Sequence, residues 1–200
     1  MLVYLDNAAT TPMDVQVIEK MTEVMHDCYG NASAIHGQGR KAKAVVEMAR
    51  KDIAKLLNCT SSELIFTGSG TEADNMALRC AVNDLEVKHI ITSEIEHKAV
   101  LDTAKELQAK NMAQVSYVKL DEYGRADLED LRKLAELNPG SLISLMHANN
   151  EIGTLNDIAA ISKIARANKC YFHTDTVQTI GHYPMDLKEL DVDFIACSAH

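Results

Sequence analysis

The sequence predicts an α/β fold in which a mainly parallel sheet is flanked by helices. Segments with apolar residues at helical spacing alternate with apolar runs that are too short for helices. This alternation is typical of βαβ units, which build parallel sheets. Hydrophobic residues make up 46% of the 200 residues and charged residues 24%, a balance typical of a folded globular protein.

The first 60 residues predict a helical lead-in to this fold. Val15, Ile18, Met21 and Met25 recur at helical spacing, and a second apolar series of the same kind runs over residues 42–56. None of the three prolines in the chain interrupts a clear helical pattern. We therefore expect two successive helices before the sheet begins.

Beyond residue 60, four helical patterns alternate with six short apolar runs. Helices are expected over residues 71–83, 98–108, 127–137 and 157–167. Strands are expected over residues 63–67, 89–92, 114–118, 141–146, 170–173 and 193–197. The prediction divides the chain into a helical segment, residues 1–60, and an α/β domain, residues 61–200.

Charge and composition exclude several classes of function. Twenty basic and 29 acidic residues give a net charge of −9, so nucleic acid and anionic membrane surfaces are poor default partners. No apolar run approaches the roughly 18 residues that span a bilayer, and the amino-terminus lacks the basic region of a secretion signal. These features predict a cytoplasmic protein.

The five cysteines contain no CxxC pair, so a zinc ribbon or a thioredoxin-like redox site is disfavoured and no metal is expected. We expect reduced thiols that serve as small buried apolar residues. Cys197 lies beside a polar cluster, but we expect packing there as well, because its neighbours belong to the same short strand.

Polar clusters follow five of the predicted strands, at the point where each strand ends. They occupy residues 68–72, 93–97, 147–151, 173–178 and 197–200. Because the carboxyl ends of parallel strands lie at one edge of the sheet, where open α/β proteins bind ligands, these clusters predict a ligand site.

The turn over residues 68–72 has features that suit a phosphate. Its glycines let the backbone approach a ligand, the first N–H groups of a helix face an anion, and Thr71 adds a hydroxyl donor. An ordinary turn with Thr71 as the helix N-cap is equally compatible with the sequence. The GK[ST] ending of a Walker loop is absent, and the spacing does not fit GxGxxG.

Three further clusters complete a recognisable set of groups. Asp175 can hold a cationic ring nitrogen, or it can cap a helix that begins near Thr176. His97 can stack on an aromatic ligand or move a proton, or it can be a surface residue at a helix start. Asn149 and Asn150 can bind a ligand or form an Asx turn. Together these groups match the needs of pyridoxal phosphate, whose chemistry the protein orients and tunes.

Seven stretches also carry a family resemblance. In order along the chain, they are LDNAATTP at 5–12, GN at 30–31, TEADN at 71–75, EHKAV at 96–100, NNEIG at 149–153, HTDTVQ at 173–178 and SAH at 198–200. With these motifs, the chain resembles the amino-terminal half of a cysteine desulfurase, in the class V aminotransferase group of pyridoxal-phosphate enzymes. Two positions depart from the family pattern: Ala32 replaces a usual proline, and Gly70 stands where alanine or cysteine is common.

The resemblance implies a three-layer, fold-type I large domain and a defined set of cofactor-binding residues. These are Gly70, Thr71, His97, Asn150, Asp175, Gln178, Ser198, Ala199 and His200. Of the set, Gly70, Thr71, Ser198 and His200 would hold the phosphate of pyridoxal phosphate.

The resemblance also implies individual roles around the cofactor ring. His97, the one catalytic residue expected in these 200 residues, would stack on the pyridine ring and help to transfer protons. Asp175 would pair with the pyridinium nitrogen, and Gln178 would reach the phenolic oxygen. Asn150 would contact the cofactor or the carboxylate of the substrate.

The activity implied by the resemblance is removal of sulfur from L-cysteine. The products would be L-alanine and an enzyme persulfide, which would serve iron–sulfur scaffold proteins or other sulfur acceptors. The enzyme would be a homodimer, with residues 1–60 contributing to a small domain and to dimer contacts.

In the family, the cofactor lysine directly follows the Ser-x-His motif, and the sulfur-accepting cysteine lies further on. Both positions fall beyond residue 200, so we expect these residues to be about half of a longer enzyme whose large domain, residues 61–200, continues past this point. Two alternatives stay open: another class V enzyme (an aminotransferase or a selenocysteine lyase), or an inactive 200-residue fragment.

Overall fold

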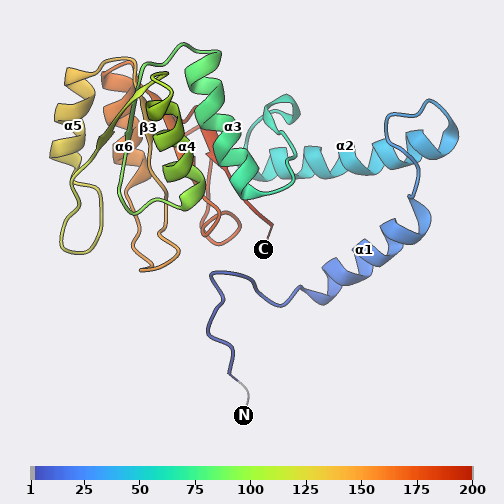
Figure 1. Cartoon of the computed structure of the whole chain (residues 1–200). Helices are drawn as coiled ribbons and strands as arrows, with labels where there is room; N and C mark the ends of the chain where they lie inside the picture. Colours follow the sequence, from blue (N-terminus) through green and yellow to red (C-terminus); the bar gives the residue numbers. More distant parts are fainter. Residues whose placement is uncertain (1–2, 200) are drawn as a thin grey trace. The chain divides into compact units, whose positions relative to one another are not determined.

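The computed structural model describes residues 3–199, which form two compact units, residues 3–66 and residues 67–199 (Figure 1). Within the described residues, no helix has both the length and the apolar character needed to cross a membrane. The sequence prediction divides the chain a few residues earlier, between residues 60 and 61.

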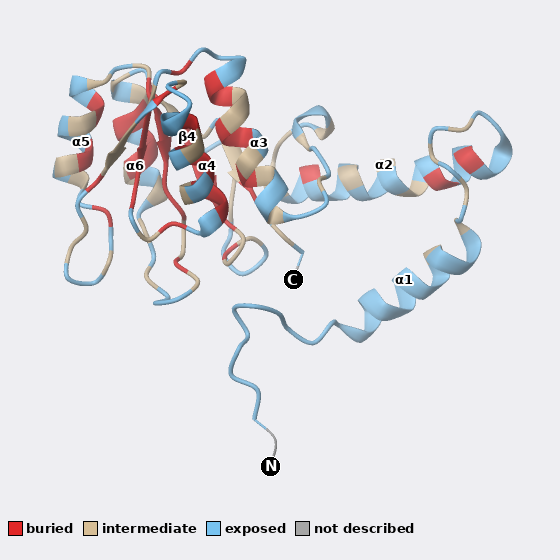
Figure 2. Cartoon of the chain, viewed as in Figure 1, coloured by how far each residue is buried: buried red, intermediate tan, exposed pale blue. Residues whose placement is uncertain are grey.

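The first unit contains the two predicted helices, α1 (Val15–Asp27) and α2 (Gly37–Leu57), followed by a short 3-10 turn, η1 (Ser61–Glu63). The Asp14 carboxylate caps α1 by accepting the N–H of Gln16. No residue of α1 is buried, and all of its residues except the half-buried Val24 are exposed (Figure 2). The helix predicted from the apolar spacing is therefore present, but its apolar side chains are not buried within this unit.

The strand predicted over residues 63–67 is wrong. Ile65 and Phe66 are 65% and 51% exposed, and the described residues form no strand there. The carbonyl of Leu64 accepts a hydrogen bond from the guanidinium of Arg50, which also lies 4.6 Å from the centre of the Phe66 ring. A short apolar run becomes a strand only when a neighbouring strand pairs with it, and here a helix side chain takes the backbone group instead.

The second unit alternates helices and strands as predicted. Its helices are α3 (Gly70–Asn83), α4 (Lys98–Ala109), α5 (Leu128–Leu137) and α6 (Ile158–Ala167). Its strands are β1 (His89–Thr92), β2 (Gln114–Tyr117), β3 (Leu142–Ser144), β4 (Tyr171–Asp175) and β5 (Phe194–Ala196). The strands form one sheet in the order β2-β1-β3-β4-β5, with every pair parallel. The α/β prediction with a parallel sheet is therefore confirmed.

Helices cover both faces of this sheet, which makes three layers (Figure 1). Successive residues of a strand point to opposite faces, so Ile90 packs with α3 and α4, whereas Ile91 packs with α5 and α6. One cluster joins Leu78, Ala81, Val82, Val100, Ala104 and Leu107 to Ile90 and Leu142. The other joins Leu131, Ala135, Ile161, Ile164 and Ala165 to Ile91, Ile143 and Phe172. Burial on both faces explains why these strands are continuous apolar runs.

We expect Phe172→Ala to lower the free energy of unfolding by about 3–5 kcal/mol, because it leaves a cavity beneath α5 and α6. Phe172 is fully buried in β4. Leu137→Ala is the matched control, since Leu137 is 77% exposed at the end of α5, and its effect should stay within about 0.5 kcal/mol. Urea denaturation measures both, and equal losses would contradict the packing described here.

Candidate active site

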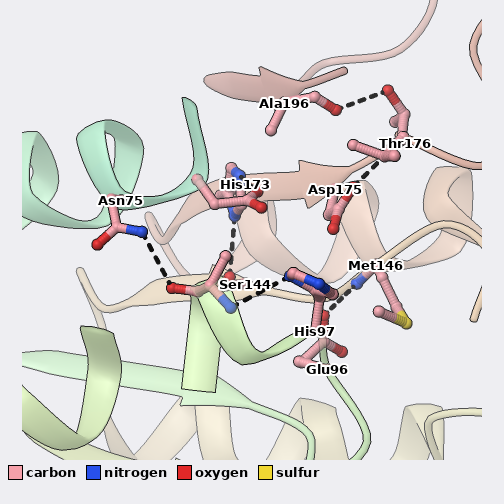
Figure 3. Close-up of polar contacts among 12 residues, drawn as sticks. Asn75, Glu96, His97, Ser144, Met146, His173, Asp175, Thr176 and Ala196 are labelled. Carbon is pink, nitrogen blue, oxygen red and sulfur yellow. Dashed lines mark hydrogen bonds and ion pairs between the residues drawn. The ribbon is translucent and has the colours of Figure 1, made fainter. Parts of the chain in front are cut away.

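The carboxyl edge of the sheet gathers an unusual number of buried polar side chains. The strands β1, β3, β4 and β5 all end at this edge, and Figure 3 shows polar contacts around those ends. The buried polar residues there are Thr92, Ser93, Glu96, Ser144, Asn149, His173, Thr174, Asp175 and Thr176. Buried polar groups are costly unless they are paired or serve a function, so this edge is the candidate site.

The first turn of α3 lies beside the end of β5. The Ser69 hydroxyl caps α3 by accepting the N–H of Glu72 at 3.1 Å, so Thr71 is not the N-cap and its side chain is exposed in the first turn. A Cβ atom on Gly70 would lie 3.0 Å from Val177 Cγ2 and 4.0 Å from Ser198 Cβ. The absence of a side chain at Gly70 therefore lets the first turn of α3, which carries Thr71, approach the segment after β5, which carries Ser198.

The predicted site residues at the end of the chain are described only in part. Ser198 is half-buried and Ala199 is exposed, while the prediction for His200 falls outside the described residues. The free N–H groups of the first turn of α3, the hydroxyl of Thr71 and the hydroxyl of Ser198 are donors suited to a phosphate.

Asp175 is the last residue of β4, and its side chain is buried. Its Oδ1 accepts the N–H of Val177 at 2.9 Å. The helix expected after it is absent from the described residues, because the N–H and the hydroxyl of Thr176 both bind the carbonyl of Ala196 and hold the chain in a turn. Burial raises the pKa of Asp175, and the nearby Asp74 charge raises it further, while the hydrogen bond from Val177 and then His173 and His97 lower it more weakly.

His97 caps α4 with its own ring. Its Nδ1 accepts the N–H of Ala99 at 3.2 Å, so a neutral His97 carries its proton on Nε2. The ring is exposed and shares a groove of about 260 Å³ with Thr71, at the start of α3. His97 thus caps α4 while its ring stays accessible to a ligand. The groove brings together two of the predicted site residues, Thr71 and His97.

The asparagine pair divides between the two predicted roles. Asn149 is buried, and its Oδ1 accepts the N–H groups of Glu151 and Ile152, which is the expected Asx turn. Its Nδ2 donates to the carbonyl of Ile95, which ties this turn to the loop that carries His97. Asn150 is half-buried and donates to the carboxylate of Glu151.

Gln178 is half-buried in the turn that follows Asp175. In the described part of the chain, the hydrogen bond of the Asn150 side chain goes to Glu151 and not to His97 or Asp175. The structure thus groups Gly70 and Thr71 with Ser198, joins Thr71 to His97 through the groove, and places Asp175 within electrostatic reach of His97.

Sequence reasoning assigned no role to Glu96, which the structure buries beneath the site. Its Oε1 accepts the hydroxyl of Ser93 at 2.7 Å. Its Oε2 accepts the N–H of Met146 at 2.8 Å (Figure 3). Burial raises the pKa of Glu96 to about 8, and the charges of Asp175 and Asp74 add to this effect against the two hydrogen bonds. The signal in the sequence was a carboxylate directly beside His97.

A buried Asp74–His173 pair was also missed. His173 Nε2 lies 3.4 Å from Asp74 Oδ1, and neither atom has a hydrogen-bond partner among the described residues. His173 Nδ1 lies 2.9 Å from the hydroxyl of Ser144. The pair connects α3 to β4 and places the Asp74 carboxyl group close to Asp175.

The cysteines follow the prediction only in part. All five are free thiols, and Cys170 is buried, whereas Cys28, Cys59 and Cys80 are half-buried. Cys197 is exposed, so the expectation that it packs inside the strand is wrong. The physical reason is that β5 ends at Ala196, which leaves Cys197 beyond the packed part of the strand.

Comparison with known proteins identifies the family. The family described as aminotransferase class-V matches residues 3–200. The chain belongs to this family. Among curated class-V relatives, cysteine desulfurase IscS of Dictyoglomus turgidum is 46% identical over 200 residues, which are 99% of this chain and 50% of that protein. The IscS protein of Methanosarcina thermophila is 44% identical, again over 99% of this chain and 49% of its own length.

Solved structures agree with this class-V assignment. A NifS-like protein superposes with a TM-score of 0.94 at 41% identity, over 100% of this chain and 55% of its own. A structure of SspA in complex with cysteine gives a TM-score of 0.92 at 33% identity, over 98% of this chain and 57% of its own. The chain thus spans about half the length of the curated relatives it matches.

We expect Glu96→Gln to change how the stability of this class-V chain depends on pH. Between about pH 5 and pH 8, Glu96 is ionised in the unfolded chain but protonated when folded, so raising the pH destabilises the fold. Glutamine resembles the protonated acid, so the stability of the variant relative to wild type should rise across this range. Thermal denaturation at several pH values measures the difference.

Glu94→Gln is the matched control, because Glu94 is exposed in the same loop. Its stability should follow the wild-type pH dependence. If Glu96→Gln also ran parallel to wild type from about pH 5 to pH 8, Glu96 would not be protonated in the folded protein.

Proposed function

We propose that the enzyme to which this chain belongs is a pyridoxal-phosphate-dependent cysteine desulfurase. It would convert L-cysteine to L-alanine and leave the sulfur as a persulfide on an enzyme cysteine. The observation that carries the proposal is the buried carboxyl edge around Asp175, next to the donor-rich first turn of α3. Curated relatives named cysteine desulfurase, at 46% and 44% identity, support the reaction class.

The residues present fit pyridoxal phosphate. The nearby Asp74 charge raises the pKa of Asp175, and a cationic ring nitrogen beside Asp175 would oppose that effect and favour the ionised carboxylate. Gly70, Thr71, Ser198 and His200 are the residues we propose for the phosphate, and Ala199 is a further proposed cofactor-binding residue. The opposite charges at the two ends of the site match a ligand with a cationic ring and an anionic phosphate.

We propose that His97 stacks on the ring, that Gln178 reaches its phenolic oxygen, and that Asn150 contacts the cofactor or the substrate carboxylate. When bound, pyridoxal phosphate supplies an electron sink for bonds broken at the substrate α-carbon. An ionised Asp175 holds the ring nitrogen protonated, which strengthens that sink. His97 carries a proton on Nε2 and accepts the Ala99 N–H on Nδ1, so its Nε2 edge is the one available for proton transfer.

Sulfur transfer requires groups that the longer enzyme supplies. A cysteine thiolate of the enzyme takes the substrate sulfur and becomes a persulfide, while the electron pair of the broken C–S bond remains with carbon and ends in a C–H bond of alanine. We assign this thiol and the cofactor lysine to the part of the enzyme beyond residue 200. We further propose a cytoplasmic homodimer, with residues 1–60 in the small domain and dimer contacts, that serves iron–sulfur scaffold or other sulfur-acceptor proteins.

The full-length enzyme, loaded with pyridoxal phosphate and given L-cysteine, should form alanine and protein-bound persulfide in equal amounts. Amino-acid analysis and cyanolysis of the persulfide measure the two products. A keto acid formed from cysteine in place of alanine would indicate an aminotransferase instead. Release of alanine from selenocysteine but not from cysteine would indicate a selenocysteine lyase.

Asp175→Asn should lower kcat for alanine formation by about 10²-fold or more, because asparagine cannot hold the ring nitrogen protonated. Glu136→Gln is the matched control, since Glu136 is an exposed carboxylate on α5 and should leave the rate unchanged. Steady-state kinetics of the two variants provide the measurement. An Asp175→Asn enzyme with wild-type kcat would argue against the proposed role of this carboxylate.

A further inference from the structure

The proposed site depends on the spacing between two helix starts. Thr71 lies in the first turn of α3, and His97 caps the first turn of α4. The two residues line the same groove, so a change in the separation of these turns would alter the contacts of a ligand bound by both. Hydrophobic packing of the two helices lies further along them, around Leu78 and Leu107.

Asn75 bridges the two first turns with all of its polar side-chain atoms. Its Nδ2 donates to the carbonyl of Thr71 at 2.7 Å and to the carbonyl of Ala99 at 3.5 Å. Its Oδ1 accepts the hydroxyl of Thr103, one turn further along α4. Figure 3 shows Asn75 with a hydrogen bond from its amide nitrogen.

The bridge continues directly to His97. Ala99, whose carbonyl accepts from Asn75, donates its N–H to His97 Nδ1. This second hydrogen bond keeps the proton of a neutral His97 on Nε2 and fixes the direction of the ring. A continuous path therefore joins the backbone of Thr71 to the ring of His97 through Asn75 and Ala99.

We propose that Asn75 is a positioning residue that sets the ring of His97, and its tautomer, relative to the phosphate-binding turn at Thr71. The consequence for catalysis rests on the proposed function, whereas the effect on the His97 ring does not require the cofactor. Asn75 also lines the groove, and the role we assign to it acts through its hydrogen bonds to Ala99 and Thr71.

A second side-chain link between α3 and α4 provides a control that distinguishes the positioning of His97 from a general effect on helix packing. Arg79, one turn beyond Asn75 on α3, pairs with Glu106 on α4, with Nη2 and Oε2 2.6 Å apart. Both side chains are part-exposed, and among the described residues the Arg79 side chain makes its hydrogen bond to Glu106, which lies beyond the first turn of α4. Arg79→Met therefore removes a cross-link between α3 and α4 without touching the path to His97.

The experiment compares Asn75→Ala, Asn75→Asp and Arg79→Met in the full-length enzyme. Asn75→Asp keeps the acceptor for Thr103 but loses both donations, so both Asn75 variants should behave alike. We expect kcat for L-cysteine to fall about 10–100-fold with a smaller change in KM, as for a misplaced catalytic group. The visible circular dichroism of bound pyridoxal phosphate should change in both, and Arg79→Met should change neither quantity.

Histidine-selective ¹⁵N spectra of the apoenzyme provide a readout that needs no cofactor. Wild-type His97 should be the Nε2–H tautomer when neutral, and the Asn75 variants should show a mixture of tautomers. Wild-type tautomer, circular dichroism and kcat in Asn75→Ala would overturn the proposal, as would equal effects from Arg79→Met. If Asn75→Ala does not fold, Thr103→Val decides, because it removes the partner of Oδ1 alone and should give a smaller change of the same kind.

The outcomes also separate this proposal from the proposed function. A wild-type enzyme that fails to bind pyridoxal phosphate would refute the function, while the tautomer of His97 in the Asn75 variants would still test the bridge. A wild-type enzyme that desulfurates cysteine, together with Asn75 variants indistinguishable from it, would refute the bridge alone.

Discussion

Parallel pairing of the strands is the constraint on which the site depends. Because all four pairings in the sheet are parallel, the carboxyl ends of β1, β3, β4 and β5 come together at one edge. The loops after β1, β2 and β3 lead into α4, α5 and α6, so the first turn of α4 also lies there, and α3 begins beside the end of β5. Exposed N–H groups of helix starts and carboxylates of strand ends thus meet in one place, which suits a ligand that carries both charges.

Electrostatics then determines which carboxyl group is available. Three acidic residues share the buried edge, and burial opposes ionisation of two of them, Glu96 and Asp175. Glu96 is protonated at neutral pH because its pKa rises to about 8, and Asp74 lies against His173. Asp175 is the remaining acid at the end of the central strands, and its raised pKa marks a position where a cation is favourable. Glu96 and Asp74, which have no proposed contact with the ligand, therefore affect the ionisation of Asp175, which has one.

Local sequence patterns predicted the repeating elements well, because helices and buried strands depend on periodicity and burial over short stretches. The helices α3 to α6 and the strands β1 to β5 lie within a few residues of the expected ranges. The secondary-structure predictions that are wrong lie where a backbone group has two possible hydrogen-bond partners. Leu64 binds a side chain of α2 instead of a strand, and Thr176 binds Ala196 instead of starting a helix. Ser69, not Thr71, caps α3 for the same reason, since either hydroxyl could have accepted the free N–H groups.

The sequence by itself determined the parallel α/β architecture, the polar edge and the residue types suited to pyridoxal phosphate, since these follow from periodicity and from motifs that are contiguous in the chain. Only the tertiary structure decided which of those residues meet. The close approach at Gly70, the protonated Glu96 and the path from Asn75 to His97 each join segments that are distant along the chain. Burial and hydrogen-bond partners across such distances are properties of the folded packing, which no local pattern records.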